Sequence, residues 1–348
     1  MPPPNSPFAK SEPSPEISFM QAASGMGSPF LTNSSRLKIV TAEEAIEAGC
    51  PFRILISGSP GSAKTHFGLT FPPPIKIIDT ENRYKLILPK FRTCQDCGES
   101  FVSTDINSKT KKIAGIKQCP SCNSLNVKIK NVSSILCNSG SLVNEASQLF
   151  IKQLEEHYTK TGEYGTLIVD NVSKKWDWDQ SEYAKKKYGH DLETKDDRLS
   201  PMNDYKFINP KHNEEFRDLI LRANCHVVMI ATTKDTYDKN DAFKVIGSRP
   251  DGQKHNPFAV DWDIFNMQGQ IALQDGTIVG NGEFTSYLKK NSLASCSINP
   301  IKFLDYKKML KAREAFLIEC GITEEKPISP SVIPPPPPTA PATPEIKK

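Results

Sequence analysis

A glycine-rich turn between two short apolar runs constrains the fold of this chain more than any other feature. The run Ile54–Ile56 leads into the turn, and a second run, Ile75–Ile78, follows a short candidate helix. Short apolar runs bounded by turn residues are typical of buried strands. Strand, glycine turn, helix and strand in this order predict a phosphate-loop nucleotide-binding fold. We therefore expect an α/β domain with a mainly parallel central sheet.

The turn carries the residue types that a triphosphate requires. Backbone N–H groups at a helix N-terminus cradle phosphate, and glycine lets the backbone approach closely. The pattern G-x-x-x-x-G-K-[ST] is met at every fixed position except the last glycine, which is Ala63 here. We expect Lys64 to contact the β- and γ-phosphates and Thr65 to hold Mg²⁺. The predicted ATP-binding residues are Gly58, Ser59, Pro60, Gly61, Ser62, Ala63, Lys64 and Thr65.

A third apolar run supports this interpretation of the turn. Leu167–Val169 is followed by Asp170. An apolar strand that ends in aspartate, in a chain with a phosphate loop, is typical of the carboxylate that supports Mg²⁺. The alternative is a chance Gly/Ser loop, and the flanking strands argue against it. We therefore predict that Thr65 and Asp170 share a magnesium site.

Two CxxC pairs predict a second metal site. Cys94 and Cys97 form the first pair, Cys119 and Cys122 the second, and residues 98–118 separate them. Each pair can place two thiolates about one Zn²⁺, and four protein ligands leave no open position, so the zinc would be structural. The alternatives are four unrelated thiols or a redox pair. We expect a zinc ribbon over residues 91–130, inserted in the ATPase domain because it interrupts the alternation of strands and helices.

Basic residues in two regions could contact nucleic acid, although each region also has an ordinary explanation. Six lysines accompany the cysteine pairs and could follow a phosphate backbone or form a solvated hairpin tip. In residues 173–211, aromatic residues alternate with lysines and could stack on single-stranded DNA or cover the edge of a core. The first group is Lys109, Lys111, Lys112, Lys117, Lys128 and Lys130, and the aromatic residues are Trp176, Trp178, Tyr183 and Tyr188.

The rest of the chain alternates between predicted helices and strands. We expect a helix from Ser141 to Tyr158 with an apolar stripe, a buried strand at 226–231, strands at 270–273 and 284–288, and a C-terminal helix from Ile301 to Ile318, within residues 300–320. A Gly/Pro-containing loop is expected around Arg249. The apolar stripe of the first helix consists of Leu142, Ala146, Leu149, Phe150 and Leu154.

Composition sets the limits for the remaining segments. The chain has 348 residues, a net charge of +4 and 28 prolines, which cluster towards its ends. Residues 1–36 are expected to be a disordered arm, and residues 325–348 a proline-rich linker or docking segment for a protein partner. A charge this small requires any nucleic-acid site to be a local patch. Lacking a leader or an apolar run of membrane-spanning length, the chain is expected in the cytoplasm, with no membrane contact.

The segments GSPGSAKT, IIDTE and TLIVD, followed by a strand ending in Thr232–Thr233, resemble the core of RecA-type ATPases. More closely, they resemble the compact RecA-like ATPases of bacteriophages that act in DNA recombination and single-strand annealing. The resemblance covers residues 37–290 apart from the zinc insertion. It implies that Glu81 activates the attacking water, with Lys64 and Asp170 as further catalytic residues.

The same resemblance implies ATP and Mg²⁺ as cofactors, single-stranded DNA as a partner, and a homo-oligomer in the host cytoplasm. A basic residue from a neighbouring subunit often completes such sites, and Arg249 and Lys254 are candidates. Two other functions remain open. One is a DNA motor of related fold, either a helicase or a packaging ATPase. The other is a nucleotide-switched adaptor with little hydrolysis.

Overall fold

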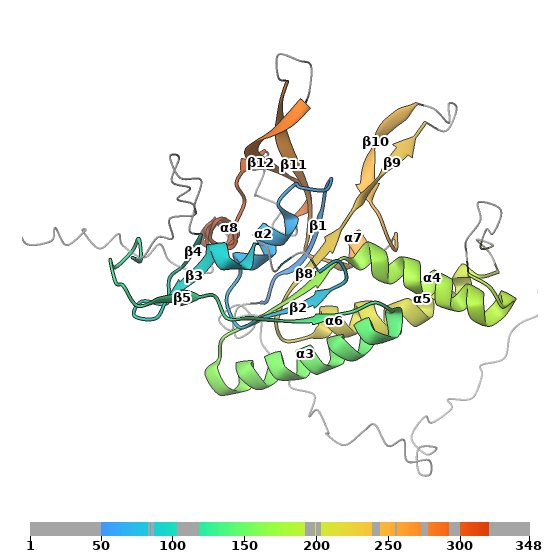
Figure 1. Ribbon diagram of the computed structural model, residues 1–348, viewed down its shortest axis with the longest axis horizontal. Helices are drawn as coiled ribbons and strands as arrows, with labels where there is room; N and C mark the ends of the chain where they lie inside the picture. Colours follow the sequence, from blue (N-terminus) through green and yellow to red (C-terminus); the bar gives the residue numbers. More distant parts are fainter. Residues whose placement is uncertain are drawn as a thin grey trace, which may run out of the picture. The chain divides into compact units, whose positions relative to one another are not determined.

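The computed structural model describes residues 50–82, 84, 87–102, 118–191, 199, 203–238, 244–254, 256–272, 278–291 and 300–319 (Figure 1). The chain divides into two units, Met1–Cys50 and Pro51–Lys348, and Cys50 alone is described in the first. The expected N-terminal arm, four of the six lysines near the cysteines (109, 111, 112 and 117) and the expected proline-rich tail lie outside the described residues.

One large sheet forms the centre of the second unit. Its eight strands lie in the order β13-β12-β11-β1-β8-β7-β2-β6, and the six from β11 to β6 are parallel. The antiparallel strands β12 and β13 extend one edge. The bounds are β1 Arg53–Ser57, β2 Ile75–Asp79, β6 Val132–Leu136, β7 Thr166–Asp170, β8 His226–Ala231, β11 Trp262–Ala272, β12 Ile278–Asn291 and β13 Ile301–Lys302. The expected α/β fold with a mainly parallel sheet is confirmed.

Helices cover both faces of the sheet. On one face lie α3 Gly140–Thr161 and the run formed by α5 Tyr205–His212, a π-helical turn at Asn213–Arg217, and α6 Asp218–Arg222. On the other face lie α2 Lys64–Leu69 and α8 Tyr306–Glu319. The remaining helices are α4 Val172–Tyr188, α7 Asn256–Ala259 and the 3₁₀ turn η2 Leu88–Lys90. No helix within the described residues is both long and apolar enough to cross a membrane.

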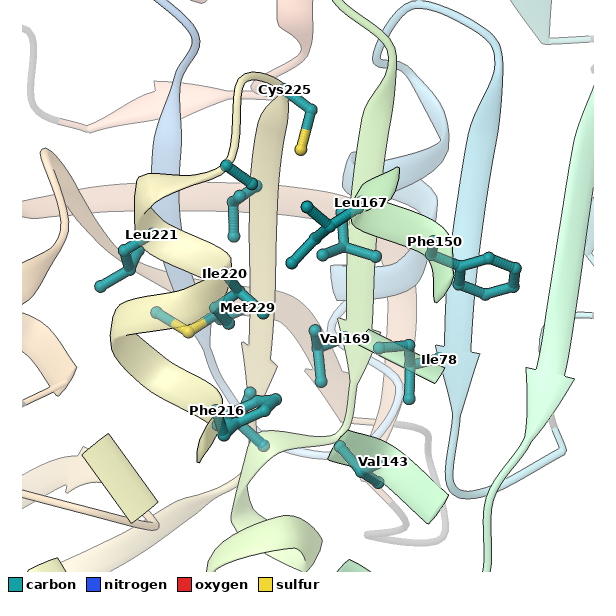
Figure 2. Packing of buried hydrophobic residues seen from close by; sticks show 14 of the residues in the cluster. Ile78, Val143, Phe150, Leu167, Val169, Phe216, Ile220, Leu221, Cys225 and Met229 are labelled. Carbon is teal, nitrogen blue, oxygen red and sulfur yellow. The ribbon is translucent and has the colours of Figure 1, made fainter. Parts of the chain in front are cut away.

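Alternation along the strands separates the two cores. Successive side chains of a strand point to opposite faces, so Leu55 packs with α3 and α6 while Ile54 and Ile56 pack with α2 and α8. Figure 2 shows the first core, where Phe216 and Ile220 face strand residues that include Met229. The sheet is therefore the buried middle layer of three, as in other α/β domains.

The structure corrects the expected apolar stripe of α3. Leu142 and Leu149 are 40% and 47% exposed, and the buried stripe contains Val143 and Ile151 instead. Ala146, Phe150 and Leu154 are buried as expected. The buried positions of α3 recur at spacings of three and four residues, which is the period of one helix face. The sequence offered two overlapping apolar stripes, and contact with the sheet selected the one that starts at Val143.

Two further expectations at the C-terminal side are corrected. The expected loop around Arg249 contains an antiparallel hairpin, β9 Thr233–Tyr237 paired with β10 Val245–Pro250. Its residues are mostly exposed, so the hydrophobic alternation that marks a half-buried strand is weak. The C-terminal helix begins at Tyr306 and not at Ile301, because Ile301–Lys302 pairs with β12 as a strand.

The cysteine-containing segment, which lies between β2 and β6 in the chain, forms a small separate sheet. Strands β3 Phe91–Cys94, β4 Ser100–Val102 and β5 Val127–Ile129 pair in the order β4-β3-β5. Phe91 packs in the core beneath α2. Lys130 is buried and donates to the carbonyl oxygen of Leu69 at 2.8 Å. Burial lowers the pKa of Lys130 to about 7, so this lysine belongs to the packing and not to a basic surface.

Candidate nucleotide site and cysteine cluster

The phosphate loop connects the carboxyl end of β1 to the N-terminus of α2. Lys64 folds back over the loop, and its Nζ donates to the carbonyl oxygens of Gly58 and Ser59, each at 2.8 Å. A Cβ atom on Gly58 would lie 2.3 Å from the carbonyl oxygen of Asn266. Only glycine fits this close approach between the loop and β11.

Ala63, the departure from the glycine pattern, adopts the left-handed conformation with φ 60° and ψ 25°. This conformation costs a residue with a Cβ about 1 kcal/mol, whereas glycine adopts it freely. The backbone geometry thus explains why the pattern has glycine at this position. In this chain Ala63 adopts the conformation at that cost, and its carbonyl oxygen accepts from Phe67 N–H at 3.0 Å.

Two buried polar residues on β11 and β12 support the phosphate loop through hydrogen bonds. The sequence motifs did not identify them. Asn266 Nδ2 donates to the carbonyl oxygen of Ser62 at 2.6 Å. The Ser286 hydroxyl donates to Asn266 Oδ1. Both side chains are buried. The sequence offered little signal for this pair, because the burial of a polar side chain is visible only in the folded structure. There, a buried polar group needs a partner.

The sheet order brings the acidic residues to the loop. Strand β8 lies between β1 and β7, and β2 lies beside β7, so the carboxyl ends of these parallel strands meet at one edge. Asp79 and Asp170 are direct partners in the β2–β7 register. The Thr65 hydroxyl donates to Asp170 Oδ2 at 2.7 Å. Glu81 follows β2 at the same edge, where its Oε1 accepts from Asn171 Nδ2 at 3.3 Å.

Burial and neighbouring negative charges make this edge suited to a cation. Burial raises the pKa of Asp170 to about 6; the charges of Glu81 and Asp79 raise it too, and the Thr65 hydrogen bond opposes them. Asp79 Oδ1 accepts from two backbone N–H groups, while its buried Oδ2 has no hydrogen-bond partner within the described structure. Hydroxyl and carboxylate oxygens are the ligands that Mg²⁺ prefers. The residues present therefore fit the expected magnesium ion.

A cavity of about 300 Å³ lies over the loop and this acidic edge. Lys64, Thr65, Glu81 and Asp170 line it. Thr232, at the end of β8, lines it as well, whereas Lys234 lies beyond it on β9 and forms an ion pair with Asp251 at 2.5 Å. The two basic candidates for a neighbouring subunit's site, Arg249 and Lys254, are exposed and do not line this cavity.

The four cysteines lie together in the small sheet. Their sulfur atoms are all within 4.8 Å of one another, with Cys94–Cys122 at 3.6 Å and Cys97–Cys119 at 3.5 Å. A tetrahedral zinc site with Zn–S bonds of about 2.3 Å has sulfur–sulfur edges of about 3.8 Å. The cluster therefore has the size that one tetrahedral ion requires.

Both CxxC segments fold into the same turn. In the first, Gly98 N–H donates to Cys94 O at 3.1 Å and Cys94 N–H to Glu99 O at 2.9 Å. In the second, Asn123 N–H donates to Cys119 O at 2.9 Å and Cys119 N–H to Ser124 O at 2.8 Å. Gly98 and Asn123 both have a positive φ, which glycine and asparagine adopt most readily. Two matching turns facing one point are suited to hold one ion.

The aromatic region at 173–211 is mainly a packing region. Trp176 is buried in a cluster with Ala184 and Ile208. Trp178 packs against the main core. Lys175 is buried too, beside Asp179. Trp176 and Lys175 are therefore unavailable to stack on nucleic acid, in agreement with the alternative of a covered core edge. Trp178 is partly buried, whereas Tyr188 is 46% exposed.

A family model described as an AAA domain matches residues 51–260, which is more than half of the 348-residue chain. The matched range includes the phosphate loop, Glu81, Asp170 and the cysteine cluster. No curated protein matches the sequence.

Proposed function

The chain belongs to the AAA-domain family, and on this premise we propose that it is an ATP-hydrolysing, single-stranded-DNA-binding protein of phage-type DNA recombination or replication. The observation that carries the proposal is the junction of the phosphate loop with the acidic edge, where Thr65 contacts Asp170 beside Glu81. The finer assignment to RecA-like phage ATPases rests on the sequence resemblance and agrees with the position of β8 between β1 and β7.

Each residue of the junction has a separate role in this proposal. The loop amides and Lys64 bind the phosphates of ATP, after Lys64 exchanges the carbonyl oxygens of Gly58 and Ser59 for phosphate oxygens. Thr65 and Asp170 hold Mg²⁺, directly or through water. The bound ion neutralises charge on the β- and γ-phosphates.

Glu81 orients and deprotonates the water that attacks the γ-phosphate in line. Asn171 supports this role, since its side-chain amide contacts Glu81 while its backbone N–H donates to the Thr80 hydroxyl oxygen at 2.9 Å. The carboxylate is thereby held at the end of β2, on the cavity wall. Thr232, which follows β8, lines the same cavity and is a candidate contact for the γ-phosphate.

We assign the cysteine cluster to one structural Zn²⁺, because four thiolates at tetrahedral spacing saturate the ion. Within the described residues the cavity contains one cationic side chain of fixed charge, Lys64. A homo-oligomer in which a neighbouring subunit supplies a further basic residue would complete the charge, and Arg249 on the exposed hairpin is a candidate.

The test is the ATPase rate of the full chain, measured as phosphate release with and without single-stranded DNA. We expect Mg²⁺-dependent turnover that rises with DNA. Lys64→Ala is the matched inactive control, because it removes the cation of the loop and leaves the core intact. Turnover at the level of Lys64→Ala, together with normal ATP binding, would instead identify a nucleotide-switched adaptor. DNA-stimulated hydrolysis together with separation of DNA strands would identify a helicase.

A further inference from the structure

A second cavity, of about 450 Å³, lies between α4 and α5, and it shares no lining residue with the nucleotide cavity. Figure 1 shows the two helices side by side. Positions 183, 186 and 187 of α4 and positions 207, 208 and 211 of α5 line it. Spacings of three and four residues place side chains on one face of a helix. The cavity is therefore formed by the facing sides of two helices.

An exposed aromatic ring forms one wall of this cavity. Phe207 is 57% exposed and lies in stacked orientation near Tyr183, with ring centroids 6.4 Å apart and an interplanar angle of 18°. The Tyr183 hydroxyl donates to Asp204 Oδ1 at 3.2 Å, which fixes the inner ring. Lys206 Nζ lies 5.1 Å from the centre of the Phe207 ring. An exposed ring on a fixed ring is a platform on which a flat ligand can stack.

Three lysines line the cavity, Lys186, Lys187 and Lys211, against two carboxylates. Lys186 has no acidic partner in the described part of the chain, and Lys211 lies 3.9 Å from Glu215 in an exposed pair, which is a weak interaction. The two carboxylates at the base are occupied internally. Asp179 is paired with Lys175 and His212, and Glu182 accepts from the Gly140 N–H at 3.0 Å. An anionic group at the rim therefore meets lysines.

One buried nitrogen at the base of the cavity lacks a partner. His212 Nδ1 lies 2.6 Å from Asp179 Oδ2, and since a carboxylate only accepts, Nδ1 is the protonated nitrogen. Burial lowers the pKa of His212, so the ring is neutral and Nε2 carries a lone pair. Nε2 is buried and has no hydrogen-bond partner in the described structure. Because Nε2 has almost no accessible surface, a ligand does not reach it, and recognition in the cavity depends on the exposed Phe207 ring and the lysines.

We propose that the cavity between α4 and α5 binds a nucleotide of single-stranded DNA. The base stacks on Phe207, and the adjoining phosphates lie against Lys186 and Lys211. A base that stacks on Phe207 displaces the Lys206 ammonium group towards its own phosphate. This inference rests on the proposed DNA-binding function and names the surface that performs it.

The test is a fluorescence-anisotropy titration of the full chain with a fluorescein-labelled poly-dT oligonucleotide. Phe207→Ala should weaken binding about tenfold, because stacking on an aromatic ring is lost. Phe207→Trp should retain the parent affinity. Phe258→Ala, which removes a 77% exposed phenylalanine outside the cavity, is the matched control and should bind as the parent does.

The lysines are tested through the salt dependence of the same titration. Changing Lys186 and Lys211 together to alanine should reduce the slope of log K against log salt by about 1.4, because each phosphate contact with a single strand contributes about 0.7. Lys152→Ala, at an exposed position of α3, should leave the slope unchanged.

Two results would overturn the inference, and they are distinguishable. If the parent chain binds poly-dT and the Phe207 and lysine variants bind equally well with the parent slope, the cavity is not the DNA site, although the chain remains a DNA-binding protein. If the parent chain does not bind poly-dT, the DNA-binding part of the proposed function fails as well. ATP turnover of Phe207→Ala should equal that of the parent without DNA, which shows that the variant is folded.

Discussion

The Thr65 hydroxyl lies 2.7 Å from Asp170 Oδ2, although 105 residues separate them in the chain. The contact exists because β1 and β7 are parallel and lie on either side of β8, so both strands end at the same edge of the sheet. The first helical turn after β1 therefore faces the last residue of β7. Mg²⁺ at this point would have a hydroxyl from one strand end and a carboxylate from the other, and the consequences of that arrangement are testable.

Glu81→Gln should separate nucleotide binding from hydrolysis. Glutamine keeps the shape of the side chain and an oxygen acceptor for Asn171, but it removes the base that activates water. ATP should bind with parent affinity while turnover falls about 10²-fold. A coupled ATPase assay alongside a nucleotide titration measures both quantities. Turnover at the parent rate would show that another residue activates the water.

Asp170→Asn should stabilise the protein in the absence of magnesium. The pKa of Asp170 is raised to about 6 from an ordinary value of about 3.9, so the folded chain binds this proton more tightly than the unfolded chain. The parent therefore loses stability as the pH rises from about 4 through 6, and at pH 7 the cost is of the order of 2–3 kcal/mol. Asparagine has no charge to bury and avoids this loss.

Thermal melts in EDTA from pH 4 to pH 8 measure this difference. The melting temperature of Asp170→Asn should exceed that of the parent at pH 7, and the two should converge below pH 4. Added Mg²⁺ should stabilise the parent and have little effect on the variant. Asp235→Asn, which changes an exposed carboxylate on β9, is the control and should melt as the parent does at each pH. A parent that melts higher than Asp170→Asn at pH 7 in EDTA would contradict the argument.

Short-range patterns predicted the parts of the site that lie within one segment. The phosphate loop, Asp170 after its apolar strand and the two CxxC pairs each occupy a few consecutive residues, so their chemistry is visible in the sequence. The support of the loop by Asn266 and Ser286 is not, because these residues come from two strands about 200 positions later. Their role depends on the pairing of β11 with β1, which no local pattern specifies.

The fold shows the same division between local and tertiary information. The strands β1, β2, β7 and β8 were predicted because they are apolar runs. Strand β6 was not predicted, and only the last residues of β11 were. The hairpin β9–β10 was not, since its exposed residues carry no alternating pattern, and β13 was merged with the helix that follows it. For α3, periodicity identified the helix, but only the position of the sheet decides between Leu142 and Val143 as the buried residue.

Asn266→Ala should weaken ATP binding, although Asn266 itself does not contact the nucleotide. The change removes the hydrogen bond to Ser62 and leaves the buried Ser286 hydroxyl without its acceptor. A buried polar group without a partner costs about 1–3 kcal/mol, so we expect a lower melting temperature and an ATP affinity about tenfold weaker. Asn126→Ala is the matched control, since it loses a hydrogen bond to Asp96 in the cysteine segment. If Asn266→Ala binds ATP with the affinity of the parent, the phosphate loop keeps its shape without the hydrogen bond from Asn266.

Replacing Cys119 and Cys122 by serine should release one zinc ion per chain and unfold only the cysteine segment. The pairs β3–β4 and β3–β5 are short. The two matching turns are joined by the cysteine cluster and by a few exposed hydrogen bonds from Ser124 and Asn126 to Asp96. A segment with so little core depends on its metal for folding. The phosphate loop lies outside this segment, so ATP binding should survive.

Elemental analysis of protein purified without chelator measures the zinc, and a nucleotide titration measures the loop. Cys137→Ser and Cys225→Ser change buried cysteines outside the cluster and should retain the zinc, which makes them the controls. Absence of zinc from the parent would contradict the assignment of the cluster. Loss of ATP binding together with zinc would show that the segment is not independent, and that the packing of Phe91 and Lys130 against α2 transmits its unfolding to the loop.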